Sequence, residues 1–340
     1  MKHSAMLVAL LALAGNAYAV PMHDAHTGHA GHATPAPIGV MGDHLHPQGD
    51  WMVSYRYMHM DMEGSLKGSD HISNKQIISP TGGTFLITPT EMTMDMHMLG
   101  VMYAPTGNLT LMAMAPYIKN SMDHRTRMGM TFTTGSEGIG DVQLGALYGL
   151  MEWNAQHLHL NLGISTPTGS INEKDHTPMG RVRLPYPMQL GSGTWDLVAG
   201  LTYGGREGKW AWGSQATGTV RLQDENDNDY RLGNRLNVTG WLVRDIARGW
   251  NASLRIDGQA WGDIHGADPK LNKDVVPTAD PDLRGGKRID VLAGVNYATR
   301  GGTHKGHTFG IEAGVPAWQN LDGPQLRTRW TVMAAWQYSF

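Results

Sequence analysis

The feature that most constrains the fold is an alternation of apolar and polar residues with period two, repeated in segments about ten residues long. The last segment is the clearest, because Trp330, Trp336, Tyr338 and the terminal Phe340 share one parity while Arg329 has the other. Soluble strands alternate too. Four aromatic residues on one face, gathered toward a strand end, are instead typical of the interfacial girdle of a membrane-spanning strand.

Charged residues inside these segments fall on the face opposite the apolar one. Leu254 and Ile256 share one parity, and Arg255 and Asp257 share the other. A membrane barrel permits such charges in mid-strand because that face lines a polar lumen. We therefore expect alternate residues to meet lipid and the barrel interior.

About twelve such segments follow one another between residues 50 and 340, and their connections alternate in length. The short connections are expected to be periplasmic turns, at residues 104–107, 151–156, 204–208, 245–249 and 300–305. The long ones are expected to be extracellular loops, at residues 63–92, 119–137, 166–193 and 263–286. The pattern predicts an all-β, antiparallel, up-and-down transmembrane barrel of about 12 strands.

The first residues indicate the compartment. Lys2 precedes an apolar run at residues 5–14, and small residues at Ala17 and Ala19 fit a signal-peptide cleavage site, so residues 1–19 are predicted to be a secretory signal peptide. Residues 20–49 lack periodicity and are predicted to be a flexible, disordered, His-rich periplasmic arm before the barrel at residues 50–340. No later run approaches the length of a transmembrane helix. A secreted chain with a barrel pattern is expected in the bacterial outer membrane.

Composition excludes several classes of function. The net charge is −3 with no basic stripe, so no nucleic-acid partner is expected. Cysteine is absent, which removes thiolate metal sites and cysteine nucleophiles. The chain has no G-x-S-x-G motif or comparable constellation, so we expect it not to be an enzyme.

The arm carries one candidate metal site. Its ligands would be histidines at every third position, His23, His26, His29 and His32. Imidazole is a common ligand of copper and zinc, and a flexible chain can wrap several around one ion. Short His-rich tracts also bind metals adventitiously, so copper is a possible cofactor and not a required one.

Methionine is abundant, with 22 residues concentrated in the first half of the barrel. If Tyr55, Leu99 and Leu111 face lipid, the intervening methionines face the lumen. We call this predicted set the methionine wall: Met58, Met60, Met94, Met96, Met98, Met102, Met112 and Met114. The same parity argument places charges in the lumen, at Arg56, Asp141, Asp196, Arg235, Arg255 and Asp257.

The methionine wall supports three hypotheses. Thioether sulfur is a soft ligand that selects Cu(I) and Ag(I), which favours metal efflux or sequestration together with the histidine arm. Methionine is also a pliable apolar surface that accommodates varied guests. Finally, it can simply fill a narrow barrel.

Three stretches resemble a family of outer-membrane proteins labelled for the meta-pathway of phenol degradation, or simply "transporter". They are GIGDVQLG at residues 138–145, STPTGS at 165–170 and LGSGTWDL at 190–197. The resemblance implies an outer-membrane barrel with a role in passage of small, often aromatic or apolar, solutes. The Met-rich first half and the His-rich arm depart from the family pattern.

We therefore expect a barrel that passes or binds a small solute, with copper or silver handling as the alternative. The expected partners are outer-membrane lipid, the small solute, and the barrel-assembly machinery acting through the C-terminal Phe340.

Overall fold

The computed structural model describes residues 36–79, 83–299, 301 and 305–340, all within one unit, Thr34–Phe340. The predicted signal peptide, residues 20–35 of the predicted arm and the four arm histidines lie outside the described residues.

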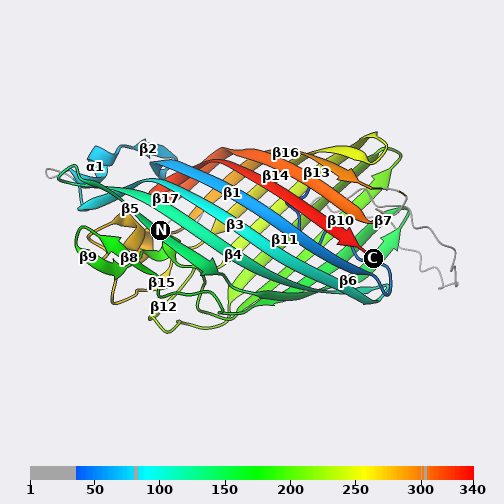
Figure 1. The fold of residues 1–340 in the computed structure, drawn as a ribbon, viewed down its shortest axis with the longest axis horizontal. Coiled ribbons are helices and arrows are strands. Elements are labelled where there is room, and N and C mark those ends of the chain that lie inside the picture. The colour runs from blue at the N-terminus through cyan, green and yellow to red at the C-terminus, as the bar shows by residue number, and fades with distance from the viewer. Residues whose placement is uncertain (1–35, 80–82, 300, 302–304) are drawn as a thin grey trace, which may run out of the picture. The chain divides into compact units, whose positions relative to one another are not determined.

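Within the described part of the chain, eleven strand elements form one antiparallel sheet that closes on itself, because the last strand pairs with the first (Figure 1). In barrel order they are β1 (Trp51–Gly68), β3 (Ile87–Thr106), β4 (Leu109–Thr126), β6 (Gln143–Trp153), β7 (Gln156–Ser165), β10 (Asp196–Glu207), β11 (Trp210–Arg221), β13 (Arg235–Ala247), β14 (Trp250–Trp261), β16 (Gly286–Ala298) and β17 (His307–Ser339). The fold is therefore the predicted all-β antiparallel barrel.

The longest strand, β17, accounts for the difference from the expected number of about 12. Residues 308–321 of β17 pair antiparallel with β16, and residues 321–339 pair antiparallel with β1. β16 and β1 run in opposite directions, because an odd number of antiparallel pairings separates them around the barrel. β17 therefore reverses direction near Leu321 and contains both of the last two predicted segments.

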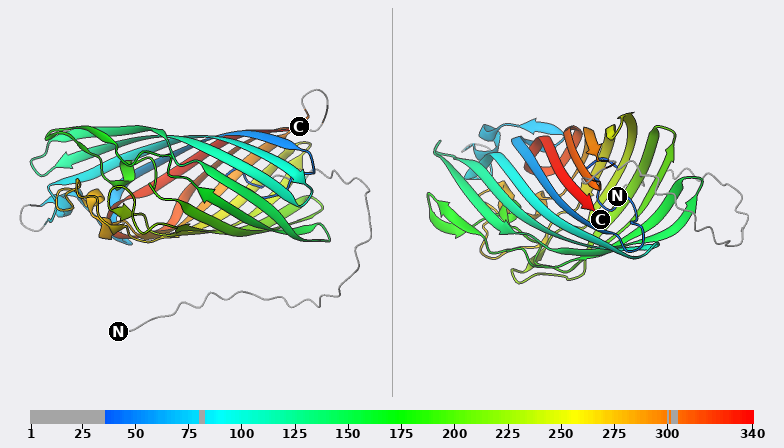
Figure 2. Two further views of the ribbon diagram at one scale, coloured as in Figure 1. Left: turned by 90° about the horizontal axis from the view of Figure 1, so that it is seen from below. Right: turned by 45° about the vertical axis from the view of Figure 1, so that its right-hand side comes forward.

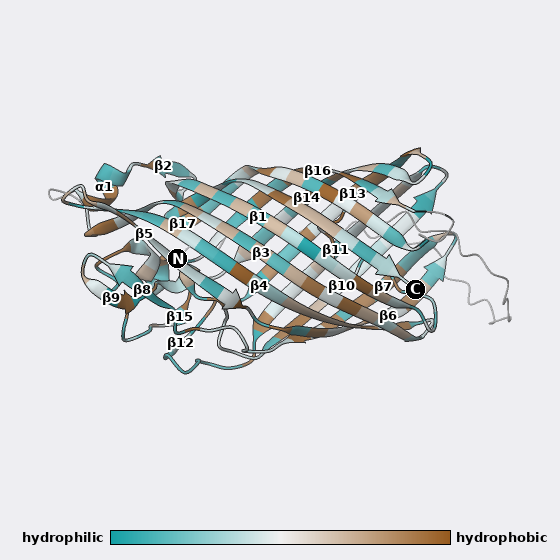
Figure 3. Cartoon of the chain, in the orientation of Figure 1, coloured by the Kyte–Doolittle hydropathy of each residue, from teal (hydrophilic) through white to brown (hydrophobic). Residues whose placement is uncertain are grey.

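The alternation places apolar side chains outside and charges inside, as the pleat of a strand requires. On β14, Leu254 and Ile256 are 61% and 59% exposed, whereas Arg255 and Asp257 are both 6% exposed. Figure 3 shows the resulting alternation of hydrophobic and hydrophilic residues along the strands. The closed sheet pairs the backbone groups of its strands with one another, and its apolar outer belt suits lipid, so the chain is a bacterial outer-membrane protein.

The barrel closes at the end that carries the C-terminus. The backbone N–H of Trp51 donates to Phe340 and that of Phe340 donates to Trp51, both at 2.9 Å. The Trp51 ring stacks on Tyr103 with centroids 4.5 Å apart, and the Trp250 ring lies 4.8 Å from that of Tyr297 in a tilted arrangement. These aromatics form one interfacial girdle.

The remaining elements gather at the opposite end (Figures 1 and 2). They are β2 (Asp70–Ile72), α1 (Asn74–Ile78), β5 (Thr131–Ile139), β8 (Lys174–Thr177), β9 (Gly180–Arg183), η1 (Tyr186–Met188), β12 (Tyr230–Arg231), β15 (His265–Gly266), η2 (Pro277–Ala279) and η3 (Pro281–Leu283). Residues 119–137, expected as a loop, instead extend β4 and turn into β5 as a hairpin. Among the described residues, no helix has the length and hydrophobicity needed to span a bilayer.

Candidate functional site

The barrel encloses a cavity of about 650 Å³. Methionines from three neighbouring strands line one side, which we call the cavity methionines: Met58, Met60 and Met62 of β1, Met94 of β3, and Met112 and Met114 of β4. They share the inward parity because the strands pair in register, with Met60 opposite Met94 and Met102 opposite Met112. This side of the cavity is soft and apolar.

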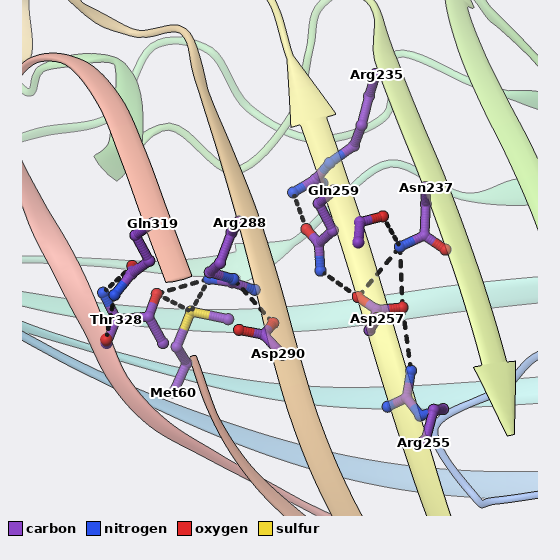
Figure 4. A network of polar contacts seen from close by, with 11 residues as sticks. Met60, Arg235, Asn237, Arg255, Asp257, Gln259, Arg288, Asp290, Gln319 and Thr328 are labelled. Atoms are coloured by element: carbon purple, nitrogen blue, oxygen red, sulfur yellow. Dashed lines mark hydrogen bonds and ion pairs between the residues drawn. The ribbon is translucent and has the colours of Figure 1, made fainter. Parts of the chain in front are cut away.

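Polar and charged side chains line the other side, on β13, β14 and β16 (Figure 4). Arg235 donates to Gln259 at 3.0 Å, and Gln259 donates to Asp257 at 2.7 Å. Asn237 donates to the same carboxylate at 3.0 Å, and Arg255 donates to it at 3.2 Å. Asp257 is thus fixed by donors from two strands.

Arg255 and Arg288 are each neutralised by nearby carboxylates. Arg255 makes a bidentate pair with Glu312 of β17, with N···O distances of 2.9 and 2.8 Å. Arg288 donates to Asp290 at 2.9 Å and to Thr328 at 2.6 Å. Charges buried in a barrel interior need such partners, since an unpaired buried charge is costly.

The two sides of the cavity meet at Met60. Its sulfur lies 4.0 Å from Nη1 of Arg288 and 3.8 Å from the hydroxyl of Thr328 (Figure 4). A guanidinium therefore borders the cavity methionines.

Two further arginines line the cavity around Trp261. The guanidinium of Arg235 lies over the Trp261 ring, 5.7 Å from its centroid. The indole N–H of Trp261 donates to the carbonyl of Arg284 at 2.8 Å. Burial lowers the pKa of Arg284 to about 10, so this side chain remains a cation at neutral pH.

Residues 36–46 lie inside the barrel, and we call them the lumen segment. The Gly42 carbonyl accepts from His159 at 2.9 Å and from Asn161 at 3.0 Å, both on β7. The Met41 carbonyl accepts from Gln215 of β11 at 2.9 Å. Inward polar side chains thus hold the backbone of a segment without regular secondary structure.

Other contacts tie the lumen segment to the rest of the wall. Asn296 of β16 donates to the Ala36 carbonyl at 3.3 Å, and the backbone N–H of His46 donates to Thr110 of β4 at 3.0 Å. Val40 packs in a buried cluster with Trp241 of β13. The predicted flexible arm thus needs correction over residues 36–49, where the chain leads from the lumen segment into β1, because inward polar side chains satisfy its backbone.

Titratable side chains lie where the lumen segment approaches β1. Nδ1 of His44 lies 2.9 Å from the carboxylate of Asp43. Burial alone would raise the pKa of Asp43, but the charge and hydrogen bond of His44 outweigh it and hold that pKa well below its usual value. The charge of Asp43 raises the pKa of His44, whereas burial and the charge of His44 lower the pKa of His46 to about 4.

The other predicted lumen residues divide into two groups. Arg56 and Met102 line a second, water-sized cavity of about 20 Å³ with Asp43 and His44. Met96 and Met98 have the inward parity, in register with Met58 and Arg56, but line neither cavity.

Asp141 and Asp196 lie at a junction of loops and not on the cavity wall. Asp141 accepts from the backbone N–H groups of Gly169 at 2.9 Å and Ser192 at 2.7 Å. Asp196 accepts from Thr194 at 2.6 Å and pairs with Arg221. We call this the motif junction, because all three family-like stretches meet in it.

Glycine is required at the motif junction by close approach. A Cβ atom at Gly191 would clash with the Asp141 carboxylate and the Gly169 backbone, and one at Gly169 would lie 2.7 Å from the Gly191 Cα. The glycines and Asp141 therefore serve one local structure.

Within the described ranges, no group of three or more His, Asp or Glu side chains is arranged to hold a metal ion. The four arm histidines lie outside those ranges, so their role stays a prediction.

The predicted set of lumen residues omitted several residues that line the cavity. Arg288 and Asp290 had the inward parity and could have been found by the rule that selected Arg255. Arg284 lies in the loop before β16, where parity gives no signal. Nothing in the local pattern of the lumen segment indicated that it folds into the barrel.

A family model described as "MetA-pathway of phenol degradation" matches residues 78–283, more than half of the chain. The chain belongs to this family. The match extends well beyond the three stretches of the motif junction and includes the charged strands β13 and β14. No curated protein sequence matches the chain.

Solved structures show a similar fold. An outer membrane channel from Pseudomonas putida F1 matches with a TM-score of 0.60 and 14% identity, over 88% of this chain and 99% of that one. The transport unit of the autotransporter AIDA-I from Escherichia coli gives 0.48 and 9%, over 89% and 94% of the two chains. The P. putida toluene transporter TodX gives 0.44 and 9%, over 87% and 91%. At 14% identity the likeness to the P. putida F1 channel concerns the fold alone.

Proposed function

We propose that this family member is a channel that binds a small solute in its lumen and passes it across the outer membrane without catalysis. The observation that carries this proposal is the cavity of about 650 Å³ inside the closed barrel. That volume falls within the range of about 300–1,000 Å³ that is usual for small-molecule sites.

The lining supports a solute with an apolar part. The cavity methionines offer a deformable surface that suits guests of varied shape. Polar groups on the opposite side are mostly fixed to one another, as with Asp257 and its donors, so they present an ordered surface.

Copper or silver binding remains the alternative hypothesis, and the cavity geometry disfavors it. Soft thioethers bind Cu(I) and Ag(I), but Arg288 lies 4.0 Å from the Met60 sulfur. An N–H of Arg288 donates to the Met60 sulfur, so this thioether is already engaged and is less available to a metal ion. The arm histidines lie outside the described residues, so the cavity geometry does not bear on metal binding by them.

The proposal is tested by liposome swelling with small solutes, using the full chain and two tryptophan variants of β3. Met94 lines the cavity, so Met94→Trp should slow uptake severalfold. Leu99 is 63% exposed on the lipid face, so Leu99→Trp should leave uptake unchanged. Uptake no faster than in empty vesicles, or equal uptake by both variants, would contradict the proposal.

We also propose that the barrel-assembly machinery recognises the C-terminal strand. The Phe340 ring is 60% exposed beside Tyr338, at a centroid distance of 5.2 Å. Phe340→Ala should lower the yield of assembled barrel in cells while leaving in-vitro refolding in detergent intact.

A further inference from the structure

The arginines of the cavity are not equivalent. Four arginines but only two aspartates line it. Arg255 and Arg288 have carboxylate partners at 2.8 and 2.9 Å. Arg235, in contrast, has a neutral amide, Gln259, as its hydrogen-bond partner and an aromatic ring beneath it. Among the described residues, no carboxylate lies within ion-pair distance of Arg235.

Arg284 is similarly unpaired among the described residues. Its Nη1 is buried and has no hydrogen-bond partner there. The nearby Asp263 already accepts from two backbone N–H groups, those of Arg284 at 2.8 Å and Gly285 at 2.5 Å. A buried donor without an acceptor is destabilising, and an anionic ligand would relieve this.

Trp261 contacts both Arg235 and Arg284. Its ring supports Arg235, its indole N–H fixes the backbone of Arg284, and all three residues line the cavity. Planar guanidiniums that keep free N–H donors are suited to bind a carboxylate with directed hydrogen bonds.

Resting on the channel function proposed above, we infer that the cavity selects small amphipathic organic anions, whose carboxylate binds Arg235 and Arg284 while the apolar body lies toward the cavity methionines. The cations and the methionines line one continuous cavity, so a single solute meets both. A neutral aromatic of the same size would leave the guanidiniums unpaired. A small hydrophilic anion would make no apolar contact with the cavity methionines. The site therefore requires both parts.

The test is calorimetric titration of the detergent-refolded full chain with benzoate, benzamide and acetate. Benzoate should bind saturably, and benzamide and acetate each about tenfold more weakly, the usual effect of losing one charge-assisted contact or the apolar contact. Arg235→Gln and Arg284→Gln should each weaken benzoate about tenfold and leave benzamide unchanged. Arg235→Lys should restore part of the affinity.

Arg244→Gln is a matched control. Arg244 is on the same strand as Arg235 and also lies over a tryptophan, 5.0 Å from the centroid of Trp210, but on the opposite parity. The Arg244→Gln variant should bind benzoate with the same affinity as the unaltered chain. Heat-dependent mobility in gels verifies that each variant is folded.

Two outcomes overturn the inference while leaving the channel function intact. One is solute uptake in liposomes without any preference for benzoate over benzamide. The other is a preference that Arg235→Gln and Arg284→Gln do not reduce. If liposomes show no uptake at all but the calorimetric preference holds, the channel function fails and the anion site stands.

Discussion

Arg255 and Glu312 form a bidentate ion pair across the lumen-facing side of β14, β16 and β17, and Gly39 of the lumen segment lies against it. The N···O distances are 2.9 and 2.8 Å, and Glu312 is 1% exposed. A Cβ atom at Gly39 would clash with both partners and would lie 2.7 Å from the terminal methyl of Met333. The ion pair and the lumen segment are therefore structurally coupled.

Gly39→Ala should displace the lumen segment from the barrel. The two charged groups that a methyl would meet are held by each other, so they cannot move aside without loss of the pair, and overpacking typically costs about 1–3 kcal/mol. We expect a larger single-channel conductance and faster proteolysis near residues 36–46. Gly107→Ala is the control, since a Cβ atom there meets nothing within 4 Å. Equal conductance in both variants would contradict the coupling.

Glu312→Gln should destabilise the barrel by about 3 kcal/mol, at the lower end of the cost of breaking a buried pair, because Arg255 keeps Asp257 at 3.2 Å. Urea unfolding monitored by tryptophan fluorescence measures the change. The double variant Arg255→Met with Glu312→Leu removes both charges and should recover most of the stability. If the double variant is as unstable as Glu312→Gln, the unpaired charge is not the cause.

Acidification should release the lumen segment. The pKa of His46 is about 4 in the folded state and 6.5 ordinarily, so its contribution to stability is present above pH 6.5 and is lost as the pH falls toward 4. The loss is on the order of 3 kcal/mol. Because the pKa of His44 is raised, its contribution to stability is already complete at pH 6.5 and does not change on further acidification. The pKa of Asp43 is lowered, so Asp43 titrates only at lower pH.

Conductance recorded between pH 7 and pH 4 measures this release. The unaltered chain should conduct more at pH 4, whereas His46→Gln should lose most of the dependence on pH. A pH profile that is the same in both proteins would assign the effect to other groups.

Asp141→Asn should loosen the loop at residues 166–193. The carboxylate accepts two backbone N–H groups with its two oxygens, and an amide would turn a donor toward one of them, at a cost of about 1–3 kcal/mol. Limited proteolysis should cut this loop faster. Asp274→Asn, at an exposed loop position, should leave the cleavage rate unchanged.

Parity arguments succeeded for residues in the interior of a strand. They placed Arg255 and Asp257 inside and Leu254 outside, and eight of the fourteen predicted lumen residues line the main cavity. They misjudged Asp141, which precedes β6, and Asp196, which is the first residue of β10, since both face a loop junction. The length of the connection also led to residues 119–137 being predicted as a loop. They form a hairpin that extends β4, which has the same polar composition as a loop.

The sequence by itself determined the barrel, because the period-two alternation fixes which side chains meet lipid once the strands pair. It also determined that methionines of β1, β3 and β4 share a face. Only the tertiary structure decided that residues 36–46 enter the lumen, since their backbone is satisfied by His159, Asn161 and Gln215 from distant strands. The same holds for Arg235 and Arg284, which both contact Trp261 only when the barrel is closed and the loop before β16 is folded onto it.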